Sequence, residues 1–267
     1  METNFNQPKR YVISKGIDRF FIEIYDIVKF ILLFFKEVFS PPFEFQEVVR
    51  QCYVVGVRSL SLITLTGFIT GLVFTKQSRP SLAEFGATSW LPSLVAIAII
   101  RALAPLVTAL ICAGKVGSHI GAELGSMKVT EQIDAMEVSA VNPFKFLVVS
   151  RVVATTLMIP VLMMYTAFVA LMGSYLDIHL NEQTSFIAFF EAAFNKITFL
   201  DFTSSFIRAL VYGFTIGMVG CYKGYHTNQG TEGVGKAANT SVVVSMFFIF
   251  IEEIVIVQII NWIRINQ

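Results

Sequence analysis

Some charged residues lie well within long apolar runs of this sequence, and we single out Arg101, Arg208, Glu252 and Glu253. A charge at the centre of a membrane costs about 2.5–3.5 kcal/mol on insertion scales, so such residues normally pair or line a wet cavity. Glu252 and Glu253 project about 100° apart on a helix and cannot share one partner. We predict that one of them meets Arg101 or Arg208 inside a bundle, either along a transport path or as a purely structural pair.

A second concentration of polar residues separates two apolar runs, at residues 113–143. Its first half repeats glycine every four residues, at Gly117, Gly121 and Gly125. On a helix these glycines form one bare face, against which another backbone can pack closely. We expect this glycine-faced helix to break at Gly125.

A second short helix is expected from about Val129 to Ala140. Its apolar positions recur at helical spacing and form a narrow stripe: Val129, Ile133, Met136 and Ala140. Its acids lie off that stripe: Glu131, Asp134 and Glu137. Asn142-Pro143 then ends the element. The pattern fits an amphipathic helix that offers its polar face to a partner, and it fits an ordinary solvated surface helix equally well.

Membrane helices must position these residues, because the composition is that of a membrane protein. Hydrophobic residues make up 55% of the 267 residues and charged residues 15%, where soluble proteins carry about 25% charged residues. A crossing needs about 20 apolar residues. Five runs are long enough, at roughly 53–75, 90–113, 144–173, 203–222 and 241–263. The net charge of +1 gives no reason to expect a nucleic-acid partner.

A different kind of helix precedes the first run. Between Gly16 and Phe39 apolar residues recur at helical spacing, and charged residues fall largely on the other side. Those charges make a crossing too costly, so we predict a helix that lies in the membrane interface. A soluble amphipathic helix packed on a partner is the alternative. The expected organisation is an N-terminal segment, 1–45, followed by a single five-span domain, 46–267.

Lysine and arginine are distributed unequally between the two sides of the predicted spans. Outside the spans, twelve lie on the side of the N-terminus, of 114–143 and of 223–239, and four lie on the other side. The side richer in these residues normally faces the cytoplasm. We therefore expect a cytoplasmic N-terminus and a C-terminus on the opposite side.

Groups that would serve catalysis or metal binding are scattered. The three cysteines lie within or beside apolar runs, and the three histidines fall in separate loops. Residues 230–237 fit the core of a phosphate-binding loop, but Ala237 stands where the hydroxyl residue is required. We expect no catalytic residues, no metal and no cofactor on this chain.

The polar stretch also carries a family resemblance. The runs Ala113-Gly-Lys-Val-Gly-Ser118 and Ala122-Glu-Leu-Gly-Ser-Met-Lys-Val-Thr-Glu-Gln-Ile-Asp-Ala-Met-Glu-Val138, followed by Asn142-Pro143, resemble the signature of the MlaE-type permeases. These permeases are the membrane subunits of ABC transporters that move phospholipids or related lipids together with MCE-domain proteins. Residues 222–240 are similar to that family's second cytoplasmic motif. Lys115 stands where the family more often has Arg, and Asn142 replaces a common Asp.

The resemblance implies an all-α membrane protein with an N-terminal interfacial amphipathic helix, five transmembrane helices, and a short cytoplasmic coupling helix between the second and third. It implies a homodimer in the bacterial inner membrane, with the C-terminus in the periplasm. A separate ABC ATPase subunit would hold ATP and Mg, and an MCE-domain lipid-binding protein would be the second partner. Coupling to the ATPase is carried over to residues of the second short helix: Glu131, Gln132, Ile133, Asp134, Met136 and Glu137.

The family pattern also bears on the membrane charges. The family usually follows the arginine at 101 with Glu, and here Ala102 stands in that place, so the acids at 252 and 253 become better partners. Glu252 is the less expected of the two. Two other functions stay open: an ion-coupled secondary transporter, and a non-transporting membrane anchor that recruits a cytoplasmic protein through 113–143.

Overall fold

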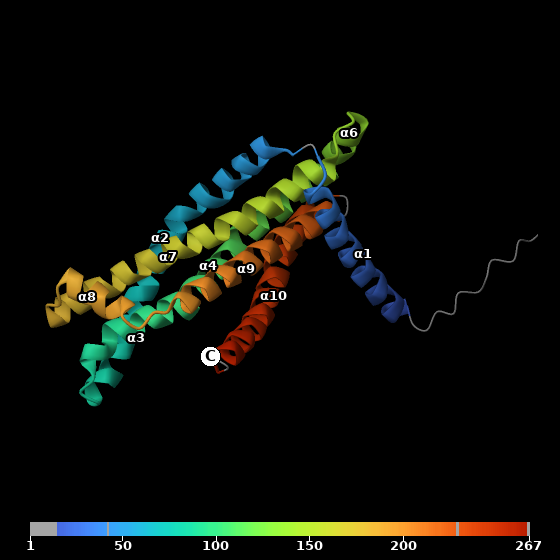
Figure 1. The fold of residues 1–267 in the computed structure, drawn as a ribbon. Helices are drawn as coiled ribbons and strands as arrows, with labels where there is room; N and C mark the ends of the chain where they lie inside the picture. The colour runs from blue at the N-terminus through green and yellow to red at the C-terminus, as the bar shows by residue number, and fades with distance from the viewer. Residues whose placement is uncertain (1–14, 42, 228–229, 266–267) are drawn as a thin grey trace, which may run out of the picture. The chain divides into compact units, whose positions relative to one another are not determined.

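The computed structural model describes residues 15–41, 43–227 and 230–265. Throughout this part of the chain the regular structure is helical, without a strand, which confirms the predicted all-α class (Figure 1). The chain forms two compact units, Met1–Pro41 and Pro42–Gln267.

The described residues of the first unit, 15–41, contain one helix, α1, from Lys15 to Val38. It covers nearly the whole range that the sequence predicted. Among its side chains from residue 21 on, large apolar groups are widely exposed, at Phe21, Tyr25, Leu32 and Phe35. A helix with exposed aromatic and aliphatic groups is compatible with an interfacial position, which stays a prediction.

Among the residues that the structure describes in the second unit, five helices are long and apolar enough to cross a membrane, by length and composition. The first is α2, Phe45–Glu84, and the last two are α9, Phe199–Tyr225, and α10, Thr231–Ile265. The third crossing joins the π-helical turn η4, Phe144–Val149, to α7, Ser150–Glu182. The five predicted spans are thereby confirmed. Four of the helices extend beyond their apolar runs at both ends, and the third extends beyond its run only at the C-terminal end.

The second crossing is assembled from six consecutive pieces: η1 (Thr88–Trp90), α3 (Leu91–Ala98), η2 (Ile99–Leu103), α4 (Ala104–Cys112), η3 (Ala113–Gly117) and α5 (Ser118–Val129). Of these, η2 and η3 are π-helical. Pro105, the second residue of α4, has no N–H to donate to the preceding turn. The carbonyls of Ile100 and Arg101 in that turn accept hydrogen bonds from Ser205 and Arg208 of α9. Arg101 lies within η2.

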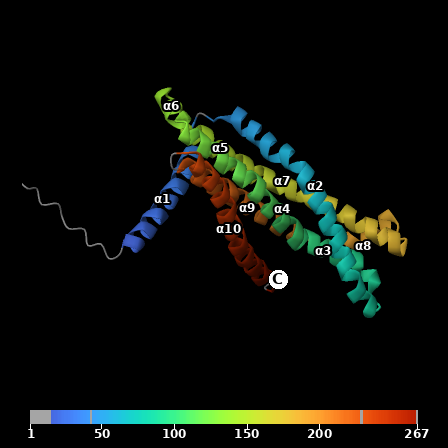
Figure 2. The same cartoon turned by 180° about the vertical axis from the view of Figure 1, so that it is seen from behind.

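Two short helices lie at opposite ends of this bundle (Figures 1 and 2). The helix α6, Gln132–Val138, connects the second crossing to the third, and α8, Phe186–Phe194, connects the third to the fourth. We call these the α6 end and the α8 end.

Helix α7 is the centre of the bundle, because it packs against α2, α4 and α9. Its approach to α2 is close enough to require glycine. A Cβ atom at Gly71 would lie 1.9 Å from the carbonyl oxygen of Ala170, and one at Gly173 would lie 2.3 Å from that of Phe68. Each helix therefore presents a glycine to the other helix's backbone, as small-residue packing in membranes requires.

Candidate functional site: the buried charges and the connecting helix

Asp201, in the first turn of α9, holds charges from two other elements. Two nitrogens of the Arg101 side chain contact its carboxylate, with Nε 2.7 Å from Oδ1 and Nη2 2.8 Å from Oδ2. Arg264, near the end of α10, places Nη2 2.6 Å from Oδ1. Asp201 is 1% exposed and also accepts hydrogen bonds from the backbone N–H and hydroxyl of Thr198. One carboxylate thus joins η2, α9 and α10.

Glu253 forms a second ion pair next to the first. Its Oε1 lies 3.0 Å from Arg208 Nη1, and the hydroxyl of Tyr212 donates to its other oxygen. The same Arg208 nitrogen also donates to the backbone carbonyl of Arg101, at 2.7 Å. The two ion pairs are therefore connected, and we refer to Arg101, Asp201, Arg208, Glu253 and Arg264 as the Asp201 cluster.

Glu252 also contacts α9, but it forms no ion pair with a described arginine. Its Oε1 accepts a hydrogen bond of 2.5 Å from Thr215, while its Oε2 is buried and has no hydrogen-bond partner in the described part of the chain. Arg208, Tyr212 and Thr215 follow one face of α9 at helical spacing. The two adjacent acids reach different residues of that one face.

The pairing of Glu253 with Arg208 is one of the combinations that the sequence left open. The partner of Arg101 is different: Asp201 was not named, because it precedes the apolar run of α9. The signal that could have found it is the capping box formed by Thr198 and Asp201 at the start of that helix. Arg151 was also missed. It is buried and lies 3.0 Å from Glu123 of α5.

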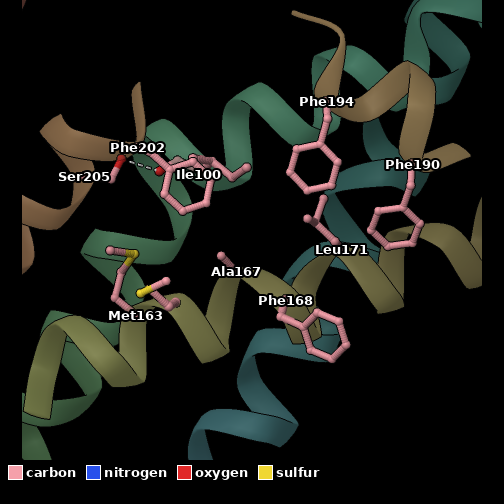
Figure 3. A pocket seen from close by; sticks show the side chains of 10 residues that line it. Ile100, Met163, Ala167, Phe168, Leu171, Phe190, Phe194, Phe202 and Ser205 are labelled. Atoms are coloured by element: carbon pink, nitrogen blue, oxygen red, sulfur yellow. Dashed lines mark hydrogen bonds between the residues drawn. The ribbon is translucent and has the colours of Figure 1, made fainter. Parts of the chain in front are cut away.

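An apolar cavity of about 170 Å³ lies between η2, α7, α8 and α9, and its lining includes Ile100 and Phe202, the sequence neighbours of Arg101 and Asp201 (Figure 3). Its walls include Met163, Phe168, Phe190 and Phe194. Its one hydroxyl, on Ser205, donates to the carbonyl of Ile100 at 2.6 Å, drawn as a dashed line in Figure 3. A dry apolar cavity of about 150 Å³ can hold benzene, so this one has room for part of a hydrocarbon chain.

The glycine face of α5 packs on α9, α10 and the segment that joins them. A Cβ atom at Gly121 would lie 2.5 Å from Ser241 Oγ, and one at Gly125 would lie 3.0 Å from Thr227 Oγ1. Gly117 faces Ile216 and Ser245 at ordinary van der Waals distance. The absence of a side chain at Gly121 and Gly125 therefore lets α5 pack closely against α10 and the segment before it.

The prediction that the helix breaks at Gly125 is wrong. Helix α5 runs through Gly125 to Val129, because the packing against Thr227 offsets the intrinsic cost of a glycine in a helix. The break comes at Glu131, whose backbone is left-handed with φ of 57°. The next helix is correspondingly shorter than the predicted 129–140. Val129 ends α5, and Ala140 is a second left-handed residue, with φ of 59°.

Helix α6 exposes the predicted polar residues. Ile133 is buried and Met136 is half-buried, while four neighbours are exposed: Glu131, Gln132, Asp134 and Glu137. Lys128 Nζ lies 2.9 Å from Asp134 Oδ1 and so connects the end of α5 to α6. Val138 is 91% exposed. The helix therefore presents acids and one bare aliphatic group at the α6 end.

Comparison with known proteins adds a family to this geometry. The family model described as Permease MlaE matches residues 48–259. A probable ABC transporter permease protein of Rickettsia typhi is 32% identical over 238 residues, which are 89% of this chain and 91% of the relative. Probable ABC transporter permease proteins of Synechocystis and of Pyropia yezoensis are 34% and 33% identical, over 78% and 79% of this chain and 79% and 80% of the relatives.

Proposed function

This chain belongs to the MlaE permease family, and from that premise we propose that it is the membrane subunit of an ABC transporter for phospholipids or related lipids. The observation that carries the substrate class is the apolar cavity beside the Asp201 cluster. Ile100 and Phe202 line the cavity, and the residues next to them in sequence are Arg101 and Asp201. A space lined by hydrocarbon groups and a single hydroxyl, without a charged side chain in its wall, suits an acyl chain better than an ion.

Helix α6 is proposed as the element that couples transport to ATP hydrolysis. Its exposed Glu131, Gln132, Asp134 and Glu137 would contact a separate ABC ATPase, which would hold ATP and Mg, while Ile133 and Met136 seat the helix on the permease. The exposed acids and the buried Ile133 support these roles. A force on α6 would enter the membrane through α5, whose glycine face is packed on α9 and α10.

The remaining partners follow from the family premise. We propose that two copies of this chain work together in the bacterial inner membrane, with the α6 end in the cytoplasm and the C-terminus in the periplasm. An MCE-domain protein at the α8 end would receive or supply the lipid. The excess of lysine and arginine on the α6 side of the spans supports this orientation.

Reconstitution tests the proposal directly. The full chain is incorporated into liposomes with an ABC ATPase and an MCE-domain protein of the same organism, and transfer of a fluorescent phospholipid is followed. We expect transfer that needs the ATPase and hydrolysable ATP. Transfer driven by an ion gradient alone would instead identify a secondary transporter. A complete complex that transfers nothing would identify a membrane anchor.

A further inference from the structure

A small groove lies between α2 and the second crossing, lined by residues outside the Asp201 cluster. Its cavity volume is about 50 Å³. The polar lining comes from Gln51, Arg58 and Ser59 of α2 and from Lys115 and His119 of η3 and α5. Aliphatic side chains make up the rest of the wall. Since one water needs about 10–15 Å³ by this kind of measure, the groove admits one small polar group and no large ligand.

The groove gathers positive charge that the described part of the chain does not neutralise. Neither Arg58 nor Lys115 forms an ion pair with a described carboxylate, and the Lys115 ammonium donates to the backbone carbonyl of Arg58. That hydrogen bond holds Lys115 against the helix that carries Arg58. Two cations that line the same groove repel each other unless an anion lies between them.

The acids that lie four residues from Gln51 and His119 in sequence, Glu47 and Glu123, pair with other groups. Glu47 accepts from Gln51 at 2.7 Å and pairs with Arg50, and Glu123 pairs with the buried Arg151 at 3.0 Å. His119 Nδ1 lies 3.9 Å from a Glu123 oxygen, which is a loose contact. The groove therefore keeps its positive charge for a ligand.

Ser59 provides a second, independent observation. Its side chain is 1% exposed, and its Oγ has no hydrogen-bond partner among the described residues. Four threonines of the same helix behave differently, since each donates to the carbonyl four residues earlier: Thr64, Thr66, Thr70 and Thr75. A buried hydroxyl without a partner costs free energy, and an acceptor placed in the groove would recover it.

Both cations stand at the depth of lipid headgroups. Arg58 lies near the start of the first apolar run, 53–75, and the next charge along the chain is Lys76. Lys115 is the first charged residue after the apolar run that follows Arg101. The polar–apolar boundary of two neighbouring helices therefore passes through the groove, where phosphates of the leaflet at the α6 end would lie.

An apolar track leads from the groove into the membrane. Counting from Arg58, the residues four, seven and eleven positions on are Leu62, Leu65 and Ile69, which share its face of α2. All three are exposed large apolar side chains. A lipid whose headgroup meets Arg58 could lay its acyl chains along this stripe.

We propose that the groove binds the phosphate of an anionic phospholipid from the leaflet at the α6 end. The Arg58 guanidinium and the Lys115 ammonium neutralise the phosphate, and the Ser59 hydroxyl donates to one of its oxygens. His119 adds a further donor at the rim. This site is separate from the cavity near α8, and it does not depend on the transport function proposed above.

The test uses the purified full chain in a neutral detergent, with added lipid and the melting temperature as readout. Phosphatidylglycerol should raise the melting temperature, whereas diacylglycerol, which lacks phosphate, should not. The double variant Arg58→Gln/Lys115→Gln should need about tenfold or more phosphatidylglycerol for the same shift. The matched control Lys76→Gln/Lys236→Gln removes two exposed charges elsewhere and should respond as the original chain does.

Ser59→Ala keeps the test decisive if the double variant folds poorly. Without lipid this variant should melt at the same temperature or higher, because an unsatisfied hydroxyl is gone, yet phosphatidylglycerol should stabilise it less. An unchanged response to phosphatidylglycerol in both groove variants would overturn the proposal. Equal stabilisation by inorganic phosphate alone would also overturn it, since the site would then take free anions rather than a lipid.

Discussion

The Asp201 cluster and the groove at Arg58 treat charge in opposite ways. In the cluster, three arginines from three elements form ion pairs with Asp201 and Glu253. The hydroxyls of Thr198 and Tyr212 also donate hydrogen bonds to these two carboxylates. In the groove Arg58 and Lys115 stand together without a described acid. Charges matched inside the chain hold helices in place, whereas unmatched charges at a membrane boundary are available to a molecule from outside.

The largest loss of stability is expected when Asp201 is changed. Asp201→Asn leaves Arg101 and Arg264 without their shared carboxylate, and removing one partner of a buried pair typically costs about 3–5 kcal/mol. We expect a large fall in the yield and melting temperature of the full chain in detergent. A variant that melts with the original protein would show that the cluster does not hold these helices together.

Glu253 should matter less for stability, because it closes one pair rather than two. Glu253→Gln leaves Arg208 uncompensated but keeps a hydrogen-bond acceptor, so we expect a loss of about 1–3 kcal/mol together with reduced lipid transfer. Glu252→Gln is the matched control. Its carboxylate meets no arginine, and the amide should be tolerated or slightly stabilising. Equal losses from both variants would remove the distinction between the two acids.

Arg264 tests the exposed edge of the cluster. Its side chain is 42% exposed, so solvent screens the pair with Asp201, and Arg264→Gln should cost only about 1 kcal/mol or less. Asp201 keeps its two contacts with Arg101. A loss as large as that of Asp201→Asn would mean that Arg264, rather than Arg101, is the main partner.

The exposed acids at the α6 end differ from both regions, because replacing them should barely change stability. Glu131→Lys with Asp134→Lys alters exposed side chains, and the surface pair with Lys128 contributes about 1 kcal/mol at most. We expect normal insertion and melting but loss of co-purification with the ABC ATPase. Glu84→Lys with Glu191→Lys reverses two acids elsewhere and serves as the charge-matched control. Retained ATPase binding would move the coupling role away from α6.

The spans could be predicted from the sequence because an apolar run long enough to cross leaves the backbone little choice but helix. The partner of Arg101 could not, for a specific reason. Asp201 lies just before its apolar run and is 100 positions away in sequence from Arg101. Hydropathy assigns it to a loop, and only the packing of α9 against the second crossing buries it.

At Gly125 the prediction failed for the opposite reason, because tertiary packing outweighed the low helix propensity of glycine. Glycine is unfavourable inside an isolated helix by about 1 kcal/mol relative to alanine, which favoured a break there. The contact with Thr227 needs the space that glycine leaves, and that contact depends on a segment about a hundred residues later. The glycine face of α5 was visible in the sequence, but the surface that fills it was not.

Arg264 has a topological consequence for the last two helices. Helix α9 ends at Tyr225 and α10 begins at Thr231, so a short connection joins them at one end. At the other end the contact between Arg264 and Asp201 spans 63 residues of sequence and closes the hairpin into a ring. A hairpin fastened at both ends cannot fray from its chain terminus alone. Hydrogen exchange in the last turn of α10 should therefore follow the state of one ion pair, and faster exchange in Arg264→Gln would reveal the open ring.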